Sequence, residues 1–327
     1  MRIAAFRSDS GRRLGVVDED GLWSLPPEAD VMELLAQAPE QRDAASAAAR
    51  RAGEPRALET LELLVPLHPT NIRDFVTFEA HVEGMSMHNG RDGEVNPAWY
   101  EAPFFYFSNT NAVVATGADV PVPPGCHDLD FELEVAAVLG RGGRDLSPDE
   151  ARSCIAAFTI FNDWSARDVG AREMRLGLGL SKAKDAASTV GPWLVTADEL
   201  EPYRKVDRYD LRLVASINGV PLGEDTLAHM AWSFEAMVAY ASRGANVAPG
   251  DLIVSGTCRN GCLAEQWGRR GRKEPPPLGP GDVVTLEVEG IGSVTNRVVE
   301  GAPARDIPTA RRGLNVDGPR GPVKAGS

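Results

Sequence analysis

Two glutamates one residue apart, Glu132 and Glu134, stand in the apolar run DLDFELEVAAVLG. Alternate side chains of a strand point to the same face, so these two carboxylates would stand roughly 7 Å apart on one side. Carboxylates held that close beside a core repel each other and resist ionising unless a cation lies between them. A third acid, Asp163, stands in the apolar run FTIFNDWSARD. Three carboxylates on apolar strands indicate a hard divalent cation with oxygen ligands.

The bulk composition is that of a soluble globular protein: 327 residues, 43% hydrophobic and 25% charged. A net charge of −13 argues against a nucleic-acid partner, because phosphate contacts need a basic surface. We see no apolar run long enough to span a membrane and no signal-peptide core, so we expect a cytoplasmic protein without membrane partners. The 33 glycines and 24 prolines indicate many turns and a β-rich fold.

The four cysteines do not form a disulfide framework in a chain of this length. Cys258 and Cys262 are close together, but no His or Cys pair follows them at zinc-finger spacing. Reduced thiols are therefore the favoured interpretation over a zinc site.

Three segments are expected along the chain: a small N-terminal domain over 1–66, a main domain over 67–304 and a mobile C-terminal tail over 305–327. The first 26 residues alternate in polarity and predict an antiparallel meander, and residues 30–64 predict helix with Asp30 as N-cap. In the main domain strands dominate, which favours a mixed α+β fold over a Rossmann or barrel fold. The predicted strands are 103–107, 131–139, 158–163, 192–196, 211–217, 252–255, 283–289 and 293–299, and the predicted helices are 228–242 and one that starts at the capping box beginning with Ser147.

Five ordered blocks resemble the fumarylacetoacetate hydrolase family: DFELEVAAVLG, IFNDWSARD, KAKDAASTVGPWLVT, VAPGDLIVSGT and LGPGDVVTLEVEGIGSVTN. The likeness covers roughly residues 67–300. It implies a β-rich α+β fold, namely a mixed β-sandwich roll with a small N-terminal α/β domain, acting as a homodimer. It also implies a divalent cation, most often Mg²⁺ and sometimes Ca²⁺ or Mn²⁺. Members mostly hydrolyse a C–C bond of a β-diketone or 2,4-dioxo acid, and some relatives decarboxylate or tautomerise oxo acids.

The resemblance assigns Glu132, Glu134 and Asp163 to the metal. The segment NIRDFVTFEAHVEG matches the block that supplies a further metal aspartate and a catalytic histidine, here Asp74 and His81. A capping role after Asn71 remains the alternative for Asp74.

A catalytic histidine needs a partner that fixes its tautomer. By position in SGTCRNGCLAEQW, the family's partner corresponds to Glu265. A simpler family branch uses an HxxE pair within one helix, but Gly84 stands three residues after His81 here. That departure favours Glu265, while Glu83 as the partner, or Glu265 on the solvated surface, stays open.

Other positions match substrate and metal neighbours in the family. Lys184 corresponds to the active-site lysine, although a surface charge beside Lys182 is the alternative. Arg167 would donate to a substrate oxygen, unless it pairs with Asp168 or Asp163. Ser188 matches a position beside the metal, and Thr257 one that bonds substrate.

The expected pocket departs from fumarylacetoacetase at four positions. Val76 and Met174 replace tyrosines, Gly170 replaces a glutamine that binds substrate, and Ala186 replaces an aromatic residue. A bulkier or less polar substrate than fumarylacetoacetate is therefore expected. The segment 85–103 is either a lid or a loop packed against a partner subunit.

These residues predict metal-enolate chemistry in which water, activated by His81 and Glu265, cleaves an acylpyruvate-like oxo acid. Oxo-acid decarboxylation or keto–enol isomerisation at the same site is the alternative, and a non-catalytic metal-binding sensor is a third. Keeping both His81 and Glu265 favours hydrolysis, because the other reactions do not need an activated water.

Overall fold

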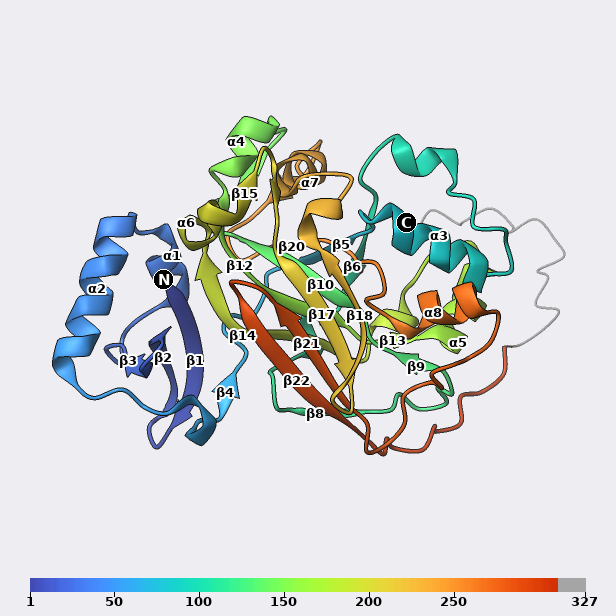
Figure 1. Cartoon of the computed structure of the whole chain (residues 1–327), viewed down its shortest axis with the longest axis horizontal. Coiled ribbons are helices and arrows are strands. Elements are labelled where there is room, and N and C mark those ends of the chain that lie inside the picture. The colour runs from blue at the N-terminus through green and yellow to red at the C-terminus, as the bar shows by residue number, and fades with distance from the viewer. Residues whose placement is uncertain (311–327) are drawn as a thin grey trace, which may run out of the picture.

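The computed structural model describes residues 1–310, and its main feature is a large mixed sheet through the centre of the molecule (Figure 1). Two short strands, β4 (Leu63–Leu64) and β7 (Val113–Val114), pair with β1 and β14 at the side of the main path. The path runs through β3 (Gly21–Ser24), β2 (Gly11–Asp18), β1 (Arg2–Ser8), β14 (Ser188–Thr196), β12 (Ile155–Asp163), β10 (Leu133–Leu139), β20 (Leu252–Val254), β5 (Ile72–Phe75) and β6 (Phe105–Ser108).

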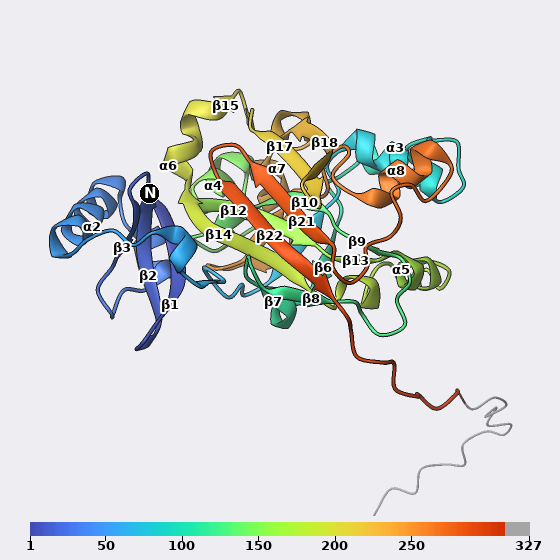
Figure 2. The same cartoon turned by 60° about the horizontal axis from the view of Figure 1, so that its bottom comes forward.

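A second sheet packs across the main one, as the red and yellow strands of Figure 2 show. Apolar side chains of both sheets fill one core cluster, among them Val135 and Ile160 from the main sheet and Leu213 and Leu286 from the second. The strand order of the second sheet is β18 (Val220–Thr226), β17 (Arg212–Ile217), β21 (Val283–Val288), β22 (Gly292–Val299) and β8 (Asp119–Pro121). Two-stranded ladders join β9 (Leu129–Asp130) to β13 (Ser165–Ala166), β11 (Gly143–Arg144) to β19 (Asn246–Val247), and β15 (Arg204–Lys205) to β16 (Arg208–Tyr209).

The helices are short. α3 (Glu79–His88) and α8 (Leu263–Arg270) pack against each other at the end opposite the N-terminal strands (Figure 1). The others are α1 (Val31–Ala36), α2 (Pro39–Ala52), α4 (Pro148–Arg152), α5 (Arg167–Met174), α6 (Ala197–Leu200) and α7 (Phe234–Ala241). Single 3₁₀ turns occur at 58–60, 97–100, 110–112, 182–184, 201–203 and 227–229.

The β-rich α+β fold class is confirmed, and the predicted strands are present with ends shifted by a few residues. The caps at Asp30 and Ser147 are confirmed, because both side chains accept hydrogen bonds from backbone N–H groups of the first helical turn. The helix predicted over 30–64 is wrong beyond Ala52, where Gly53 ends α2. The helix predicted over 228–242 is wrong at its start, because Ser233 caps α7 and a 3₁₀ turn precedes it.

The N-terminal strands extend the main sheet. Arg2 and Ile3 of β1 pair with Val195 and Leu194 of β14, and the Met1 ammonium group donates to Thr196 Oγ1 at 2.7 Å. The boundary at residue 66 stays a prediction.

The C-terminal end of the described chain runs over the surface. Residues 301–310 form no helix or strand and are mostly exposed, and the rest of the tail predicted over 305–327 lies outside the described residues. No helix within residues 1–310 is long and apolar enough to cross a membrane.

Candidate active site

The alternation that places the glutamates is observed on the main sheet. Leu133 and Val135 belong to the core between the two sheets, whereas Ala136 belongs to the cluster on the opposite face. Glu132, directly before β10, and Glu134, its second residue, are both buried. The two carboxylates therefore share the face that the second sheet does not cover.

Four buried carboxylates converge at one end of β5, β10 and β12. Tyr106 Oη of β6 donates to Asp74 Oδ2 at 3.1 Å and to Asp163 Oδ2 at 2.7 Å, which joins the two outer strands. Lys184 Nζ lies 2.8 Å from Asp163 Oδ2 and also donates to Glu132. Thr257 Oγ1 donates to Glu134 Oε1 at 3.1 Å. Asp74, the least secure ligand by sequence, thus lies in the same cluster.

The electrostatics of this cluster show a shortage of positive charge. Burial, followed by repulsion from neighbouring carboxylates, raises the pKa of Asp74 and of Glu134 well above the ordinary range. Burial and Glu132 likewise raise the pKa of Asp163, against the opposing charge of Lys184. Burial alone would raise the pKa of Glu132, but Lys184 and Arg167 lower it to about 2. The charges of Lys184 and Arg167 thus keep the pKa of Glu132 low, whereas the pKa values of Asp74, Glu134 and Asp163 stay raised.

Within residues 1–310, four buried oxygens of this cluster have no hydrogen-bond partner: Asp74 Oδ1, Glu134 Oε2, Asp163 Oδ1 and Ser188 Oγ. Leaving such atoms unpaired in a protein interior is costly. A set of carboxylate oxygens with free lone pairs is the donor set of a hard divalent cation such as Mg²⁺, Mn²⁺ or Ca²⁺. The residues present therefore fit a divalent cation.

Lys184 is buried at the centre of the cluster. Its ammonium group also donates to Ser165 Oγ at 2.7 Å, and although burial lowers its pKa, Asp163 and Glu132 outweigh that effect and raise it. A surface charge, the alternative considered for Lys184, is wrong, because its side chain is only 3% exposed at the end of the 3₁₀ turn over residues 182–184. The Lys182 side chain is 74% exposed.

A single carboxylate fixes that turn. Glu173 of α5 accepts hydrogen bonds from the backbone N–H groups of Ser181, Lys182 and Ala183 at 2.6–3.1 Å. Since the turn ends at Lys184, Glu173 contributes to the position of the buried ammonium group.

Arg167 pairs with acids other than those considered from sequence. Its Nη2 atom lies 2.7 Å from Asp130 Oδ2 and 2.8 Å from Glu132 Oε1. Asp168 instead accepts from the backbone N–H of His127. Sequence reasoning missed Asp130, which also accepts from the backbone N–H groups of Leu263 and Ala264 at the start of α8. This buried carboxylate thus joins Arg167 to α8.

His81 of α3 and Glu265 of α8 face each other, with 3.5 Å between Nδ1 and Oε2. Glu265 is fully buried, and its oxygens accept from Asn260 N at 2.8 Å and Arg269 Nε at 3.1 Å. The structure therefore brings Glu265, rather than Glu83, to the histidine. The separation is slightly longer than a good hydrogen bond.

The remaining predicted substrate residues are placed differently from one another. Val76 follows β5, and its carbonyl oxygen accepts from Trp99 Nε1 at 2.7 Å. Gly170 is buried on α5, where an added Cβ would lie 3.1 Å from Leu180. Met174 ends α5 with a side chain that is 59% exposed. Whether these residues contact substrate stays a prediction, as does the lid over 85–103.

Sequence reasoning also missed Tyr106, Ser165 and Cys262. Tyr106 lies in the run FFYFS, where it alternates with Phe105 and Phe107, so the polar face of that strand was a usable signal. Ser165 and Cys262 gain their neighbours only through the packing of distant segments.

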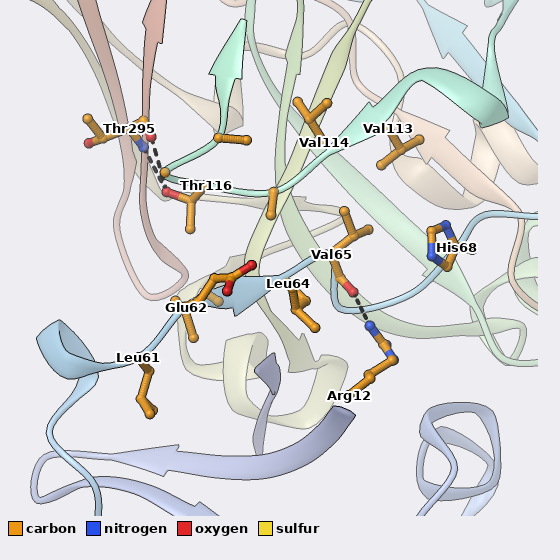
Figure 3. A pocket seen from close by; sticks show the side chains of 14 residues that line it. Arg12, Leu61, Glu62, Leu64, Val65, His68, Val113, Val114, Thr116 and Thr295 are labelled. Atoms are coloured by element: carbon orange, nitrogen blue, oxygen red, sulfur yellow. Dashed lines mark hydrogen bonds between the residues drawn. The ribbon is translucent and has the colours of Figure 1, made fainter. Parts of the chain in front are cut away.

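A cavity of about 890 Å³ lies elsewhere, lined mainly by the segments 61–65 and 113–118 (Figure 3). It opens where β1 and β14 diverge, with β4 on one side and β7 on the other. Leu64, Val65, Val113 and Val114 line it, and Arg12 donates to the Val65 carbonyl oxygen at 2.7 Å. Its described lining includes none of the four carboxylates, so we assign no chemistry to it.

Comparison with known proteins decides the family. The model of the fumarylacetoacetate (FAA) hydrolase C-terminal domain matches residues 70–299, most of the chain. The chain belongs to the fumarylacetoacetate hydrolase family. This match covers the second sheet, the main sheet from β5 onward and each of the four converging carboxylates.

Relatives in this family carry different activities in their names. The fumarylacetoacetase of Arabidopsis thaliana is 28% identical over 258 residues, and the match spans 64% of this chain but only 61% of the plant protein. Human oxaloacetate tautomerase FAHD2A, a mitochondrial protein, is 28% identical over 314 residues, with 91% of this chain and 92% of that protein covered. The family therefore includes both hydrolases and tautomerases.

Solved structures show the same fold. A maleylpyruvate hydrolase from Sphingobium sp. SYK-6, crystallised with manganese(II) and pyruvate, has a TM-score of 0.68 at 22% identity, covering 92% of this chain and 100% of that chain. A 2-hydroxyhepta-2,4-diene-1,7-dioate isomerase from Mycobacterium marinum has a TM-score of 0.65 at 23% identity, covering 92% and 98%.

Proposed function

We propose that this chain is a divalent-metal-dependent hydrolase that cleaves a C–C bond of a 2,4-dioxo acid of the acylpyruvate type. The observation that carries the proposal is the His81–Glu265 pair, which lies beside a cluster of carboxylates suited to a cation. The overall reaction adds water: an acylpyruvate gives a carboxylic acid and pyruvate.

Asp74, Glu132, Glu134 and Asp163 would hold the cation, with Mg²⁺ the expected ion. When bound, it would supply a Lewis acid for the neighbouring oxygens of a dioxo acid and stabilise the negative charge that develops there.

The protein groups divide the proton transfers and the charge stabilisation. His81 Nε2 takes a proton from water, while Glu265 accepts a hydrogen bond from Nδ1–H and stabilises the charged ring. The hydroxide formed in this way attacks the distal carbonyl group, and the oxygen of that carbonyl group develops negative charge. Lys184 and Arg167 carry buried N–H donors that can stabilise that charge. The C–C bond breaks, and the carbon of the leaving fragment accepts the proton that His81 took from water, which gives pyruvate.

Oxaloacetate keto–enol tautomerisation is the second candidate. The specific observation in its favour is coverage: the match to the human tautomerase runs over nearly the whole of both chains, whereas the match to the plant fumarylacetoacetase does not. The same His81 would then move a proton between carbon and oxygen, with no attack by water.

One experiment separates these reactions. The purified chain is assayed with acylpyruvates, fumarylpyruvate and oxaloacetate in the presence of Mg²⁺, Mn²⁺ or Ca²⁺, and products are identified by NMR. Hydrolysis yields pyruvate plus an acid, tautomerisation changes only the enol absorbance, and decarboxylation releases CO₂. If no acylpyruvate is hydrolysed and oxaloacetate is rapidly converted between its enol and keto forms, the chain is a tautomerase and not a hydrolase.

The proposal includes a homodimer. Phe104 and Phe107 are 44% and 62% exposed at β6, the end strand of the main path, and Tyr100 is 56% exposed nearby in the chain. Exposed aromatic groups of this kind are typical of protein interfaces. Light scattering of the purified chain tests it, and a monomeric mass at micromolar concentration would contradict it.

A further inference from the structure

His81, Cys262 and Glu265 form a compact group of possible metal ligands behind the carboxylate cluster. His81 Nδ1 lies 3.9 Å from Cys262 Sγ and 3.5 Å from Glu265 Oε2. One ligand atom of each residue lies within 4.8 Å of the other two, and all three side chains are buried. The neighbours of Cys262 along the chain offer no zinc-finger spacing. Folding supplies the histidine from 181 positions away.

The donor set differs in kind from that of the four carboxylates. An imidazole nitrogen, a thiolate sulfur and one carboxylate oxygen are the ligands that Zn²⁺ prefers, whereas Mg²⁺ prefers oxygen alone. Tetrahedral zinc, with bonds of about 2.0–2.3 Å, separates its ligand atoms by about 3.3–3.7 Å. Of the two separations at His81, 3.5 Å falls within that range and 3.9 Å exceeds it by about 0.2 Å, while the ligand atoms of Cys262 and Glu265 lie within 4.8 Å of each other.

Glu265 keeps a free lone pair that could bind a cation. Glu265 Oε2 accepts one hydrogen bond, from Asn260 N, so a second lone pair is free. Arg269 contacts the other oxygen, Oε1. The thiol of Cys262 lies 3.9 Å from the Nδ1 atom of His81.

We propose that His81, Cys262 and Glu265 bind a zinc-type divalent cation, separate from the cation of the carboxylate cluster, and that this second cation inhibits the enzyme. On binding, Cys262 gives its thiol proton to water, and the imidazole proton moves from Nδ1 to Nε2 as the cation takes its place between His81 Nδ1 and Glu265. A neutral imidazole bound through Nδ1 carries its proton on Nε2, so His81 can no longer accept a proton from water. The inhibitory role rests on the proposed function, whereas the binding site does not.

Cadmium tests the site directly, because Cd²⁺ bound to a thiolate absorbs in the ultraviolet. The full chain is saturated with Mg²⁺, kept reduced with a phosphine and titrated with Cd²⁺. Wild type is expected to show the thiolate band and to reach its plateau at one equivalent. Cys262→Ser removes the band, and the matched control Cys258→Ser, also buried and four positions earlier, keeps it. A wild type without the band, or a band that survives in Cys262→Ser, overturns the site.

A second variant covers a failure of Cys262→Ser to fold. His81→Ala keeps the thiol and removes one ligand, so the Cd²⁺ affinity is expected to fall at least tenfold. Unchanged affinity in a folded His81→Ala protein overturns the site.

Zinc inhibition tests whether the second cation inhibits the enzyme. With Mg²⁺ held constant, Zn²⁺ lowers the turnover of wild type and of Cys258→Ser, each normalised to its own uninhibited rate. Cys262→Ser is expected to need at least tenfold more Zn²⁺ for the same loss. Equal sensitivity in Cys262→Ser and wild type overturns the inhibitory role, and the cadmium band remains informative even if no acylpyruvate is a substrate.

Discussion

Gly84 of α3 lies so close to Glu265 of α8 that a Cβ at position 84 would stand 2.2 Å from Glu265 Cγ. In the simpler family branch, the glutamate follows the histidine within one helix. Here position 84 is a glycine, and the glutamate that faces His81 comes from α8. The absence of a side chain at position 84 is what lets the buried carboxylate reach His81.

We predict that Gly84→Ala displaces Glu265. In an open helix this change would stabilise by about 1 kcal/mol, but overpacking of a dense contact costs about 1–3 kcal/mol. The expected result is a lower free energy of unfolding and a reduced kcat, measured by chemical denaturation and by the substrate assay. Gly53→Ala is the control, because an added Cβ there meets nothing within 4 Å. A Gly84→Ala protein more stable than wild type would contradict the prediction, because it would mean that Glu265 moves aside at little cost in free energy.

We predict that His81→Ala keeps the metal and loses hydrolysis. Removing a general base lowers kcat by about 10²–10⁴, while the carboxylates that would hold the cation are untouched. Turnover and Mn²⁺ affinity are measured on the same preparation, with His68→Ala, a histidine lining the cavity of Figure 3, as the control. Turnover at the wild-type rate in His81→Ala would assign the base to another group.

We predict that Lys184→Met strongly destabilises the protein in EDTA. Lys184 is the buried cation of Glu132 and Asp163, and stranding buried charges costs about 3–5 kcal/mol. Lys182→Met, two residues away and exposed, should change the free energy of unfolding by less than about 0.5 kcal/mol. Equal effects of the two substitutions would mean that the ammonium group at 184 is not the charge that compensates the acids.

We predict that His88 makes the fold sensitive to acid. Burial, with Arg167 next in size, lowers the pKa of His88 in the folded protein, so the unfolded chain binds the proton more readily. Its contribution is therefore fully present above the unfolded pKa of about 6.5 and is lost as the pH falls below it. His88→Gln should lose less stability than wild type between pH 7.5 and pH 5.5, as measured by chemical denaturation at each pH. Parallel losses in wild type and His88→Gln would contradict this.

Much of the site could be predicted from sequence because its signals are local. The alternation around Glu132 and Glu134 needs only the period of a strand, and the burial of Asp163 follows from the apolar run before it. Family matching added Asp74 and His81, which the structure brings to the same end of the sheet. The cap at Ser147 was equally local.

The parts that could not be predicted depend on packing between distant segments. Asp130 acts through backbone N–H groups of Leu263 and Ala264, more than 130 positions away, and nothing in its own neighbourhood indicates that. α8 was missed as well, although Leu263 and Trp267 at helical spacing, with Gly271 as the left-handed C-cap, were a usable signal. The Lys182–Lys184 turn depends on Glu173, which no pattern of spacing reveals.

The most direct test of the account is a Mn²⁺ titration of wild type and Glu134→Gln, with free Mn²⁺ followed by electron paramagnetic resonance. Glu134 Oε2 is buried without a hydrogen-bond partner, and the amide of glutamine preserves its shape while removing its charge. We expect wild type to bind one Mn²⁺ per chain at the carboxylates and Glu134→Gln to bind it at least tenfold more weakly. A wild type that binds no Mn²⁺, or a Glu134→Gln protein with unchanged affinity, would contradict the metal site on which the proposed function depends.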